Sequence, residues 1–318
     1  MSEFDIINKY FAARAKNRPD VRVGIGDDAA VVQPAPGSEL VITTDTLIAG
    51  VHFPETTLPY DIGHKALAVN LSDLAAMGAT PAWVTLALTL PQESADWIKS
   101  FCDGFFTLAD RYSVQLIGGD LTRGPLSITV QALGYAPIGK ALLRSGAKPT
   151  DLIYVTGTLG DAGLGLRFLQ QGITLDVSYQ PWILERLNRP EPRIMAGEIL
   201  RFLASAAIDI SDGLAADLGH ILESSHAGAL IYPDQLPLSE ASTCTLAPAE
   251  AITLALTAGD DYELCFTLPA ELRGTLERLP SFPCRLTCIG EITRQPGLEL
   301  RYQNGNPYHG PIFGYQHF

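Results

Sequence analysis

The sequence predicts an α/β (α+β) protein of two domains, and three observations lead to this fold class. Strand and helix patterns alternate over the first 137 residues, a second alternating series follows, and the stretch Ala136-Pro137-Ile138-Gly139 separates the two. The chain has 318 residues, of which 47% are hydrophobic, so two domains of ordinary size can each bury a core. We therefore place an N-terminal α/β domain at residues 1–137 and a C-terminal α/β domain at 138–318.

The N-terminal domain is expected to begin with an amphipathic helix over residues 4–15, because apolar side chains recur there at helical spacing. After the turn Pro34-Ala35-Pro36-Gly37, residues 39–43 indicate a strand. Residues 61–77 predict a helix that ends at Gly78. The further elements expected are a strand at 83–90, a helix at 95–112, and strands at 114–117 and 126–134, separated by a turn at Gly118-Gly119-Asp120.

The C-terminal domain is expected to begin with a strand at residues 152–156, a glycine-rich turn and a helix at 162–170. Residues 179–203 predict helix apart from their prolines, and 206–210 a short strand. Leu214, Leu218, Ile221 and Leu222 then mark another helix, and residues 262–268 another strand.

Charge and cysteine content narrow the class of protein. Thirty-five acidic residues against 22 basic ones give a net charge of −13, which disfavours a nucleic-acid binder and fits a protein that collects divalent cations. For most of these residues a solvated surface role is the simpler explanation. The five cysteines match no zinc motif, so reduced thiols are expected. No apolar run reaches the roughly 20 residues that span a bilayer, and the first residues lack a signal-peptide pattern, so we expect a cytoplasmic protein without a membrane partner.

Aspartates stand among glycines and apolar residues in six short segments. These segments are Gly26-Asp27-Asp28-Ala29, Thr43-Thr44-Asp45-Thr46, Asn70-Leu71-Ser72-Asp73, Gly118-Gly119-Asp120, Asp209-Ile210-Ser211-Asp212-Gly213 and Gly259-Asp260-Asp261-Tyr262. Buried unpaired charge is costly, so hard cations are the natural partners, and several Mg²⁺ ions together indicate phosphate chemistry. Any single aspartate can still be structural. Asp209 or Ser211, for example, could be the N-cap of the helix that follows.

Two familiar phosphate-binding motifs nearly match and are rejected. The segment Gly134-x4-Gly139-Lys140-Ala141 resembles a P-loop, but Pro137 removes an amide from the phosphate cradle and Ala141 replaces the hydroxyl that would hold Mg²⁺. The segment Gly24-x-Gly26-x-x-Ala29 resembles a dinucleotide fingerprint, but two aspartates would repel the pyrophosphate. Arg144 keeps two interpretations, a clamp for a nucleotide phosphate or a surface salt bridge.

Taken in order, the motifs resemble the thiamine-monophosphate kinase family over nearly the whole chain. The stretches that carry the resemblance are Gly24–Ala29, Thr43–Phe53, Lys65–Gly78, Leu116–Arg123, Arg144–Ala147, Asp209–Leu214 and Asp260–Leu264. Each short piece alone would be unspecific, whereas the combined order is highly specific.

The resemblance implies the fold shared with aminoimidazole-ribonucleotide synthetase. In that fold the sheet of the N-terminal α/β domain pairs with that of a second subunit, which implies a homodimer, and a C-terminal α/β domain completes the chain. The implied reaction is ATP-dependent phosphorylation of thiamine monophosphate to thiamine diphosphate, the last step of making that coenzyme. We expect direct in-line transfer assisted by several Mg²⁺ ions and no phospho-enzyme, because a phosphate monoester is already largely ionised near neutral pH.

Site residues follow from the resemblance, position by position. The implied metal ligands are Asp28, Thr43, Thr44, Asp45, Asp73, Asp120, Asp209 and Asp212. Those implied to face ATP are Gly119, Asp120, Arg144 and Ser211. Those implied to contact the thiamine phosphate are His52, Asp260, Asp261 and Tyr315. The chain departs from the family pattern at Asp260, where the family often has glutamate, and at Gln316, where it usually has aspartate.

Two other functions remain open from the sequence. One is another ATP-using enzyme of the same superfamily, acting on an amide, formyl or selenide group. A selenide-using member would carry a reactive cysteine near the N-terminus, whereas the first cysteine here is Cys102. The other is a nucleotide- and Mg²⁺-binding regulator without catalysis, which turnover with ATP and thiamine monophosphate would exclude. A third alternative is a purely structural acidic protein, which predicts no Mg²⁺-dependent nucleotide binding.

Overall fold

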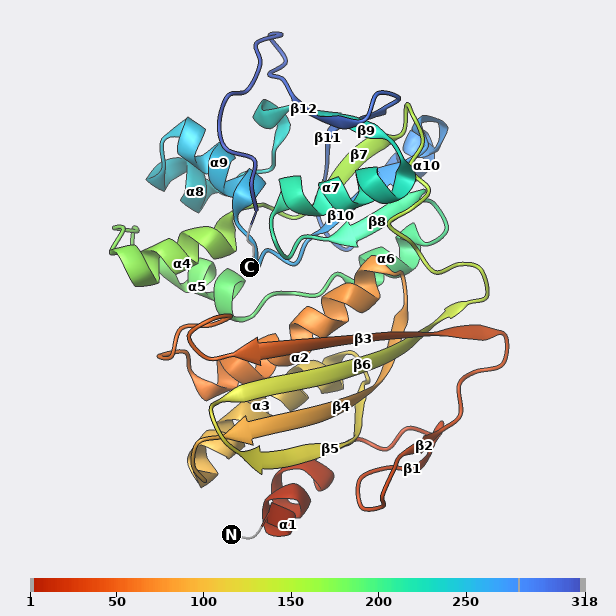
Figure 1. Ribbon diagram of the computed structural model, residues 1–318, viewed down its shortest axis with the longest axis vertical. Helices are drawn as coiled ribbons and strands as arrows, with labels where there is room; N and C mark the ends of the chain where they lie inside the picture. Colours follow the sequence, from red (N-terminus) through yellow and green to blue (C-terminus); the bar gives the residue numbers. More distant parts are fainter. Residues whose placement is uncertain (1–2, 280, 315–318) are drawn as a thin grey trace. The chain divides into compact units, whose positions relative to one another are not determined.

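The computed structural model describes residues 3–279 and 281–314 (Figure 1). The chain forms two compact units. The first holds the residues up to Leu74 together with Ala79–Ala141, and the second holds Ala75–Gly78 together with the residues from Leu142 on. Each unit combines helices with a β-sheet, which confirms the predicted α/β (α+β) class. Among the described residues, no helix has the length and apolar character needed to cross a membrane.

A four-stranded sheet in the order β3-β6-β4-β5 forms the first unit. Its strands are β3 (Ser38–Ile48), β6 (Ser127–Pro137), β4 (Thr80–Leu90) and β5 (Gln115–Arg123), and a separate two-stranded sheet contains β1 (Val21–Val23) and β2 (Val31–Val32). Strands β4 and β5 run parallel, whereas β6 pairs antiparallel with both β3 and β4. The predicted strand at 39–43 was too short, because polar Thr43–Thr46 continue β3 with alternating burial.

Two long helices, α2 (Pro59–Ala76) and α3 (Ala95–Arg111), cover one face of this sheet in Figure 1 and confirm the predicted helices. Two glycines let the helices approach closely. A Cβ at Gly63 would lie 2.0 Å from the Phe101 carbonyl oxygen, and one at Gly104 would lie 1.9 Å from that of Tyr60. The side chains of Leu67, Leu71 and Leu74 on α2 are completely buried.

The N-terminal segment differs from the single helix expected over residues 4–15. It is a short α-helix, α1 (Glu3–Ile6), followed by a π-helix, η1 (Ile7–Ala12). The π-helix has wider turns, with the Ala13 amide donating to the carbonyl oxygen of Asn8, five residues back. Ile6, Tyr10 and Phe11 are all buried, so the segment packs against the first unit.

The predicted turn at Gly118-Gly119-Asp120 is wrong, because these residues lie inside β5. The register between β4 and β5 shifts between Val84 and Thr85, opposite this segment. Gly119 has a φ of +152°, and a Cβ there would lie 1.9 Å from the Leu86 carbonyl oxygen. Glycine is therefore required because two backbones meet there.

A six-stranded sheet in the order β12-β9-β11-β7-β10-β8 forms the second unit. Its strands are β7 (Leu152–Thr156), β8 (Ala206–Asp209), β9 (Gly228–Ile231), β10 (Leu264–Leu268), β11 (Leu286–Thr293) and β12 (Gly297–Leu300). Only the β12–β9 pair is parallel. Ile153, Ile208, Leu218 and Ile289 belong to the buried core of this unit. The sequence pattern anticipated β7, β8 and β10 but not β9, β11 or β12.

Helices of the second unit surround this sheet (Figure 1). They are α4 (Asp161–Gln171), α5 (Gln180–Asn188), α6 (Ile194–Leu200), α7 (Leu214–Ser225), α8 (Glu240–Thr245), α9 (Pro248–Thr257) and α10 (Arg273–Glu277), with 3-10 turns η2 (Pro233–Gln235) and η3 (Ala270–Leu272). Pro190 and Pro192 lie between α5 and α6, as the predicted interruption of helix at 179–203 requires.

Candidate active site

Two carboxylates of the first unit come together where β3 meets α2. Thr43 and Asp45 lie on the same partly buried face of β3, because side chains alternate along a strand. The Thr43 hydroxyl donates to Asp73 of α2 at 2.5 Å, and the Asp45 backbone amide donates to the side-chain oxygen of Asn70 at 3.1 Å. Burial and, after it, the charge of Asp73 raise the pKa of Asp45 to about 6. A cation bound to these oxygens would offset both effects.

Two other predicted residues, Thr44 within β3 and His52 after it, do not belong to the cluster of Thr43, Asp45 and Asp73. The Thr44 side chain is exposed on the opposite face of β3 from Thr43 and Asp45, so it points away from their cluster. His52 lies in the turn after β3, where its Nδ1 accepts the Ile48 backbone amide at 3.0 Å. In the neutral imidazole this bond places the ring proton on Nε2.

A cavity of about 780 Å³ lies within the first unit and joins two of the predicted motifs. The loop Gly24–Ala30 forms one wall and Gly118–Leu121 of β5 another, so Asp28, Gly119 and Asp120 line the same space. Asp28 and Asp120 are both exposed. The structure therefore brings together motifs that are about 90 residues apart in the sequence.

In the second unit, a segment between β8 and α7 carries Asp209, Ser211 and Asp212. Asp209 is buried at the end of β8, where it pairs with Leu264 at the start of β10. The helix is not capped by Ser211 or Asp209, as the structural alternative required. Its N-cap is Gly213, and the side chain that accepts the free amides is that of Asp217.

One oxygen of Asp217 holds this segment in place. It accepts the backbone amides of Ser211, Asp212 and Gly213 at 3.0, 3.0 and 3.1 Å. Burial is the main cause that raises the pKa of Asp217 to about 7, and the neighbouring charge of Asp212 adds to it. The sequence analysis missed Asp217, although an aspartate in the first turn of an otherwise apolar helix was a detectable signal.

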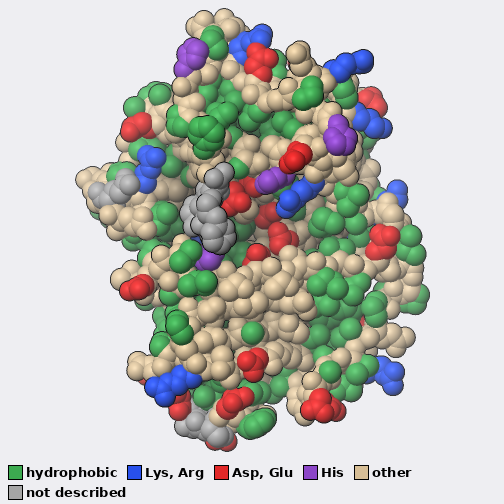
Figure 2. Space-filling view, in the orientation of Figure 1, with side chains coloured by type: hydrophobic (Ala, Val, Ile, Leu, Met, Phe, Trp, Pro, Cys, Tyr) green, Lys and Arg blue, Asp and Glu red, His purple; other side chains and the backbone are tan. Residues whose placement is uncertain are grey.

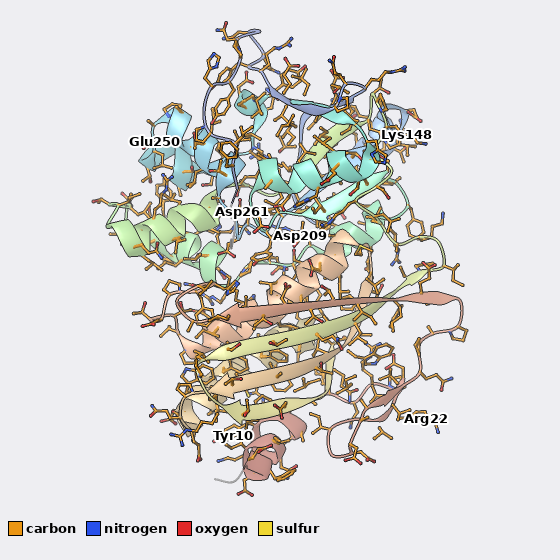
Figure 3. All side chains as sticks on the ribbon, viewed as in Figure 1. Tyr10, Arg22, Lys148, Asp209, Glu250 and Asp261 are labelled. Atoms are coloured by element: carbon orange, nitrogen blue, oxygen red, sulfur yellow. The ribbon has the colours of Figure 1, made fainter. Side chains whose placement is uncertain are left out.

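The two aspartates that precede β10, Asp260 and Asp261, lie in different environments. Asp260 has a left-handed φ of +67°, and its carboxylate accepts the Tyr262 hydroxyl at 3.1 Å. Asp261 is 1% exposed, and it accepts the amides of Gly160 and Ala162 at the start of α4 at 2.6 and 3.4 Å. The expected contact of Asp261 with substrate does not fit this placement. Its carboxylate instead satisfies the first amides of a helix. Figure 3 labels Asp209 and Asp261, which lie near the paired ends of β8 and β10.

Arg144 lies on the exposed segment that enters the second unit, next to β8, where the Leu143 carbonyl accepts the Ala207 amide. No described residue forms a hydrogen bond or ion pair with its guanidinium, which gives no support to the salt-bridge interpretation. Tyr315, the other aromatic candidate for substrate contact, lies outside the described residues.

The side chains of the described residues do not by themselves complete the coordination of a metal ion. Within residues 3–279 and 281–314, no three His, Cys, Asp or Glu side chains converge closely enough to hold a metal. Among the predicted ligands, Asp73 acts electrostatically on Asp45, Asp28 and Asp120 line one cavity, and Asp209 and Asp212 belong to one short segment. Mg²⁺ is usually held by one or two carboxylates, with phosphate oxygens and water completing the octahedron. The donor set therefore fits Mg²⁺ bound together with phosphates.

Sequence reasoning also missed a buried ion network around Glu263. This carboxylate accepts hydrogen bonds from Arg186 at 2.9 Å and from two nitrogens of Arg193 at 2.6 and 2.5 Å. The run Arg189-Pro190-Glu191-Pro192-Arg193 was a signal, because prolines fix the backbone that aims Arg193 inward. The network joins the α5–α6 connection to the start of β10, so we assign it to stability.

Comparison with known proteins agrees with these features. The model of the AIR synthase related protein N-terminal domain matches residues 26–136, and that of the C-terminal domain matches residues 148–303. The thiamine-monophosphate kinase of Escherichia coli K12 is 49% identical over 318 residues, covering 99% of this chain and 98% of that protein.

Solved structures give the same result. The crystal structure of thiamine-monophosphate kinase from Stenotrophomonas maltophilia K279a has a TM-score of 0.88 at 49% identity, covering 97% of this chain and 98% of that one. The structure of AaThiL complexed with AMPPCP and TMP has a TM-score of 0.78 at 30% identity, covering 99% and 96%. The resemblance drawn from the motifs is confirmed: the chain belongs to the thiamine-monophosphate kinase family and is built from two AIR synthase related domains.

Proposed function

We propose that this chain transfers the γ-phosphoryl group of ATP to thiamine monophosphate, forming ADP and thiamine diphosphate. The observation that carries the proposal is 49% identity over 99% of the chain to a thiamine-monophosphate kinase. A relative with the same fold was solved with AMPPCP and TMP together, a pairing that matches the two substrates. The aspartates of both units supply the chemistry that such a reaction needs.

The reaction is a direct in-line displacement. An oxygen of the thiamine phosphate forms a bond to the γ-phosphorus of ATP while the bond from that phosphorus to the oxygen of ADP breaks. The attacking phosphate is already largely ionised near neutral pH, so no side chain has to act as a strong base and no phospho-enzyme forms. The remaining difficulty is that two polyanions must be held together in line.

Carboxylates of the chain meet this difficulty by holding Mg²⁺, which supplies positive charge to the phosphates. The proposed ligands are Asp28, Thr43, Asp45, Asp73, Asp120, Asp209 and Asp212, with Thr44 contributing its main-chain oxygen. Gly119, Asp120, Arg144 and Ser211 face ATP, and the free guanidinium of Arg144 fits a phosphate. His52, Asp260 and Tyr315 contact the thiamine phosphate, His52 through its Nε2 proton. Asp261 is left out because its carboxylate is buried against amides.

A homodimer that joins two copies through the first unit is part of the proposal. The face of the β3-β6-β4-β5 sheet that α2 and α3 leave uncovered bears hydrophobic and uncharged groups in Figure 2, with charged side chains around its margin. Leu40, Ile42 and Ile48 of β3 are 43, 54 and 42% exposed. Such an apolar surface favours association. We assign ATP and Mg²⁺ binding and dimerisation to residues 1–137, further ATP and substrate contacts to residues 138–318, and a cytoplasmic location.

The test is formation of ADP and thiamine diphosphate from ATP and thiamine monophosphate, with Mg²⁺ and with EDTA. Stoichiometric formation of both products only with Mg²⁺ supports the proposal. The same assay on Asp45→Asn and Asp120→Asn tests the proposed ligands. Asp110→Asn is their matched control, because Asp110 is an exposed carboxylate of α3 paired with Lys16 at 3.1 Å. ATP binding without turnover would instead favour the catalytically inactive regulator, and turnover of a different acceptor would favour another enzyme of the superfamily.

A further inference from the structure

The cavity of the first unit is lined by two chemically different sets of residues. One set is acidic and glycine-rich and contains Asp27, Asp28, Gly119 and Asp120. The other set comes from the N-terminal segment and contains Glu3, Phe4, Ile7, Asn8 and Phe11, of which three are apolar. At about 780 Å³, the cavity lies within the range of small-molecule sites. A nucleotide has the same division, with charged phosphates at one end and a flat, weakly polar base at the other.

The N-terminal set belongs to a part of the chain that the family model does not include. That model begins at residue 26, whereas α1 and the π-helix η1 cover Glu3–Ala12. Short π-helical turns occur frequently at functional sites, where they redirect side chains. The buried residues Ile6, Tyr10 and Phe11 anchor the segment, while Phe4 remains 73% exposed at the cavity. An exposed phenylalanine beside a cavity is a surface on which a flat ring can stack.

Asn8 is the uncharged polar residue of the N-terminal set, which also contains the carboxylate of Glu3. It is exposed, and within the part of the chain that the structure describes its side-chain amide has no hydrogen-bond partner. An asparagine amide donates through nitrogen and accepts through oxygen. Adenine offers the complementary pair, an amino donor beside a ring-nitrogen acceptor, and asparagine binds it through both. Guanine presents a different order of donors and acceptors along its edges.

We propose that Phe4 and Asn8 bind the base of the nucleotide, and that Asn8 makes the chain prefer adenine to guanine. The proposal rests on ATP being the phosphate donor, and it adds the residues that select it. Phe4 contacts the face of the base and contributes equally to the affinity for any purine. Asn8 contacts the edge of the base and contributes only to the affinity for adenine. Neither residue touches the transferring phosphoryl group.

The test compares kcat/KM for ATP and GTP, with equilibrium binding of both nucleotides measured in parallel, in the wild-type chain and in three variants. Asn8→Ala should lower the ATP preference by about 10- to 100-fold, the range expected for loss of a two-bond contact to a base. Asn8→Asp should shift preference further toward GTP, because a carboxylate only accepts and guanine presents neighbouring donors. Phe4→Ala should raise KM for both nucleotides alike and leave their ratio unchanged.

Lys9→Ala is the matched control. Lys9 is exposed on the same π-helix, stacks its ammonium 4.9 Å from the Tyr10 ring, and does not line the cavity. It should change neither KM nor the ratio. An unchanged ATP-to-GTP ratio in both Asn8 variants, or a wild-type chain that binds the two nucleotides equally, would overturn the inference while leaving the kinase proposal intact. Absence of turnover would overturn the kinase proposal, and the binding measurement would still decide the role of Asn8.

Discussion

Replacing Glu263 by glutamine should destabilise the second unit strongly, because it breaks a buried ion network. The Glu263 carboxylate accepts the Thr156 hydroxyl at 2.6 Å, Arg186 at 2.9 Å, and two nitrogens of Arg193. Its side chain is 1% exposed, and those of Arg186 and Arg193 are 10% and 18% exposed. The pKa of Arg193 is raised, since burial, which lowers it, is outweighed by the hydrogen bonds and charge of Glu263. Both guanidinium groups lose a buried counter-charge once Glu263 is neutral.

The cost can be estimated from buried pairs in general. Removing one partner of a buried salt bridge costs about 3–5 kcal/mol, mostly because the other charge remains buried and unpaired. For units of this size each kcal/mol corresponds to about 2–4 °C in melting temperature, so the variant should melt about 6–20 °C lower. Glu263→Gln keeps the volume of the side chain, so the change reports on charge and hydrogen bonding rather than on a cavity.

Thermal and urea unfolding of Glu263→Gln and Glu277→Gln would test this reasoning. Glu277 pairs with Arg273 at 2.8 Å on α10, but both side chains are more than half exposed, at 58% and 57%. An exposed pair of this kind contributes little to stability, so Glu277→Gln should unfold almost as the wild type does. If Glu263→Gln unfolds within about 1 kcal/mol of the wild type, the network contributes no net stability and the argument is refuted.

Three further predictions concern aspartates. Asp217→Ala should lower the turnover rate at least about tenfold, because three backbone amides lose their acceptor. Asp217→Asn keeps an acceptor oxygen and should retain activity. If both variants lost the same share of kinase activity, this reasoning would be contradicted. Burial raises the pKa of Asp261 from 3.8 to about 8, so the folded chain holds a proton that the unfolded chain releases, and stability should fall as pH rises from about 4 to 8. Urea unfolding at pH 5 and pH 8 measures the free energy of unfolding of both proteins. That of Asp261→Asn should rise relative to the wild type at pH 8. A difference that is the same at both pH values would exclude the raised pKa of Asp261. Asp45→Asn and Asp120→Asn should abolish turnover with little loss of folding, and wild-type activity in either would remove that residue from the metal set.

Prediction from the sequence succeeded where a local pattern fixes a local element. The apolar face of Leu67, Leu71 and Leu74 indicated α2, and these side chains are buried. It failed at β5, because glycines that suggest a turn can also permit close contact between strands, and the Leu86 backbone that Gly119 approaches lies on another strand. The strands β9, β11 and β12 were missed because sheet pairing stabilises short segments whose own patterns are weak.

The sequence by itself determined the family and the set of aspartates, because motif order along the chain needs no coordinates. It could not tell a catalytic aspartate from a structural one. Asp260 and Asp261 are neighbours with the same side chain, yet only the tertiary structure shows that Asp261 satisfies the amides that begin α4. The tertiary structure likewise decided that Asp217 supports the Ser211–Gly213 segment and that Asn8 lines the cavity of Asp28 and Asp120. The physical reason is that burial and hydrogen-bond partners set the role of a polar side chain, and residues distant in sequence supply both.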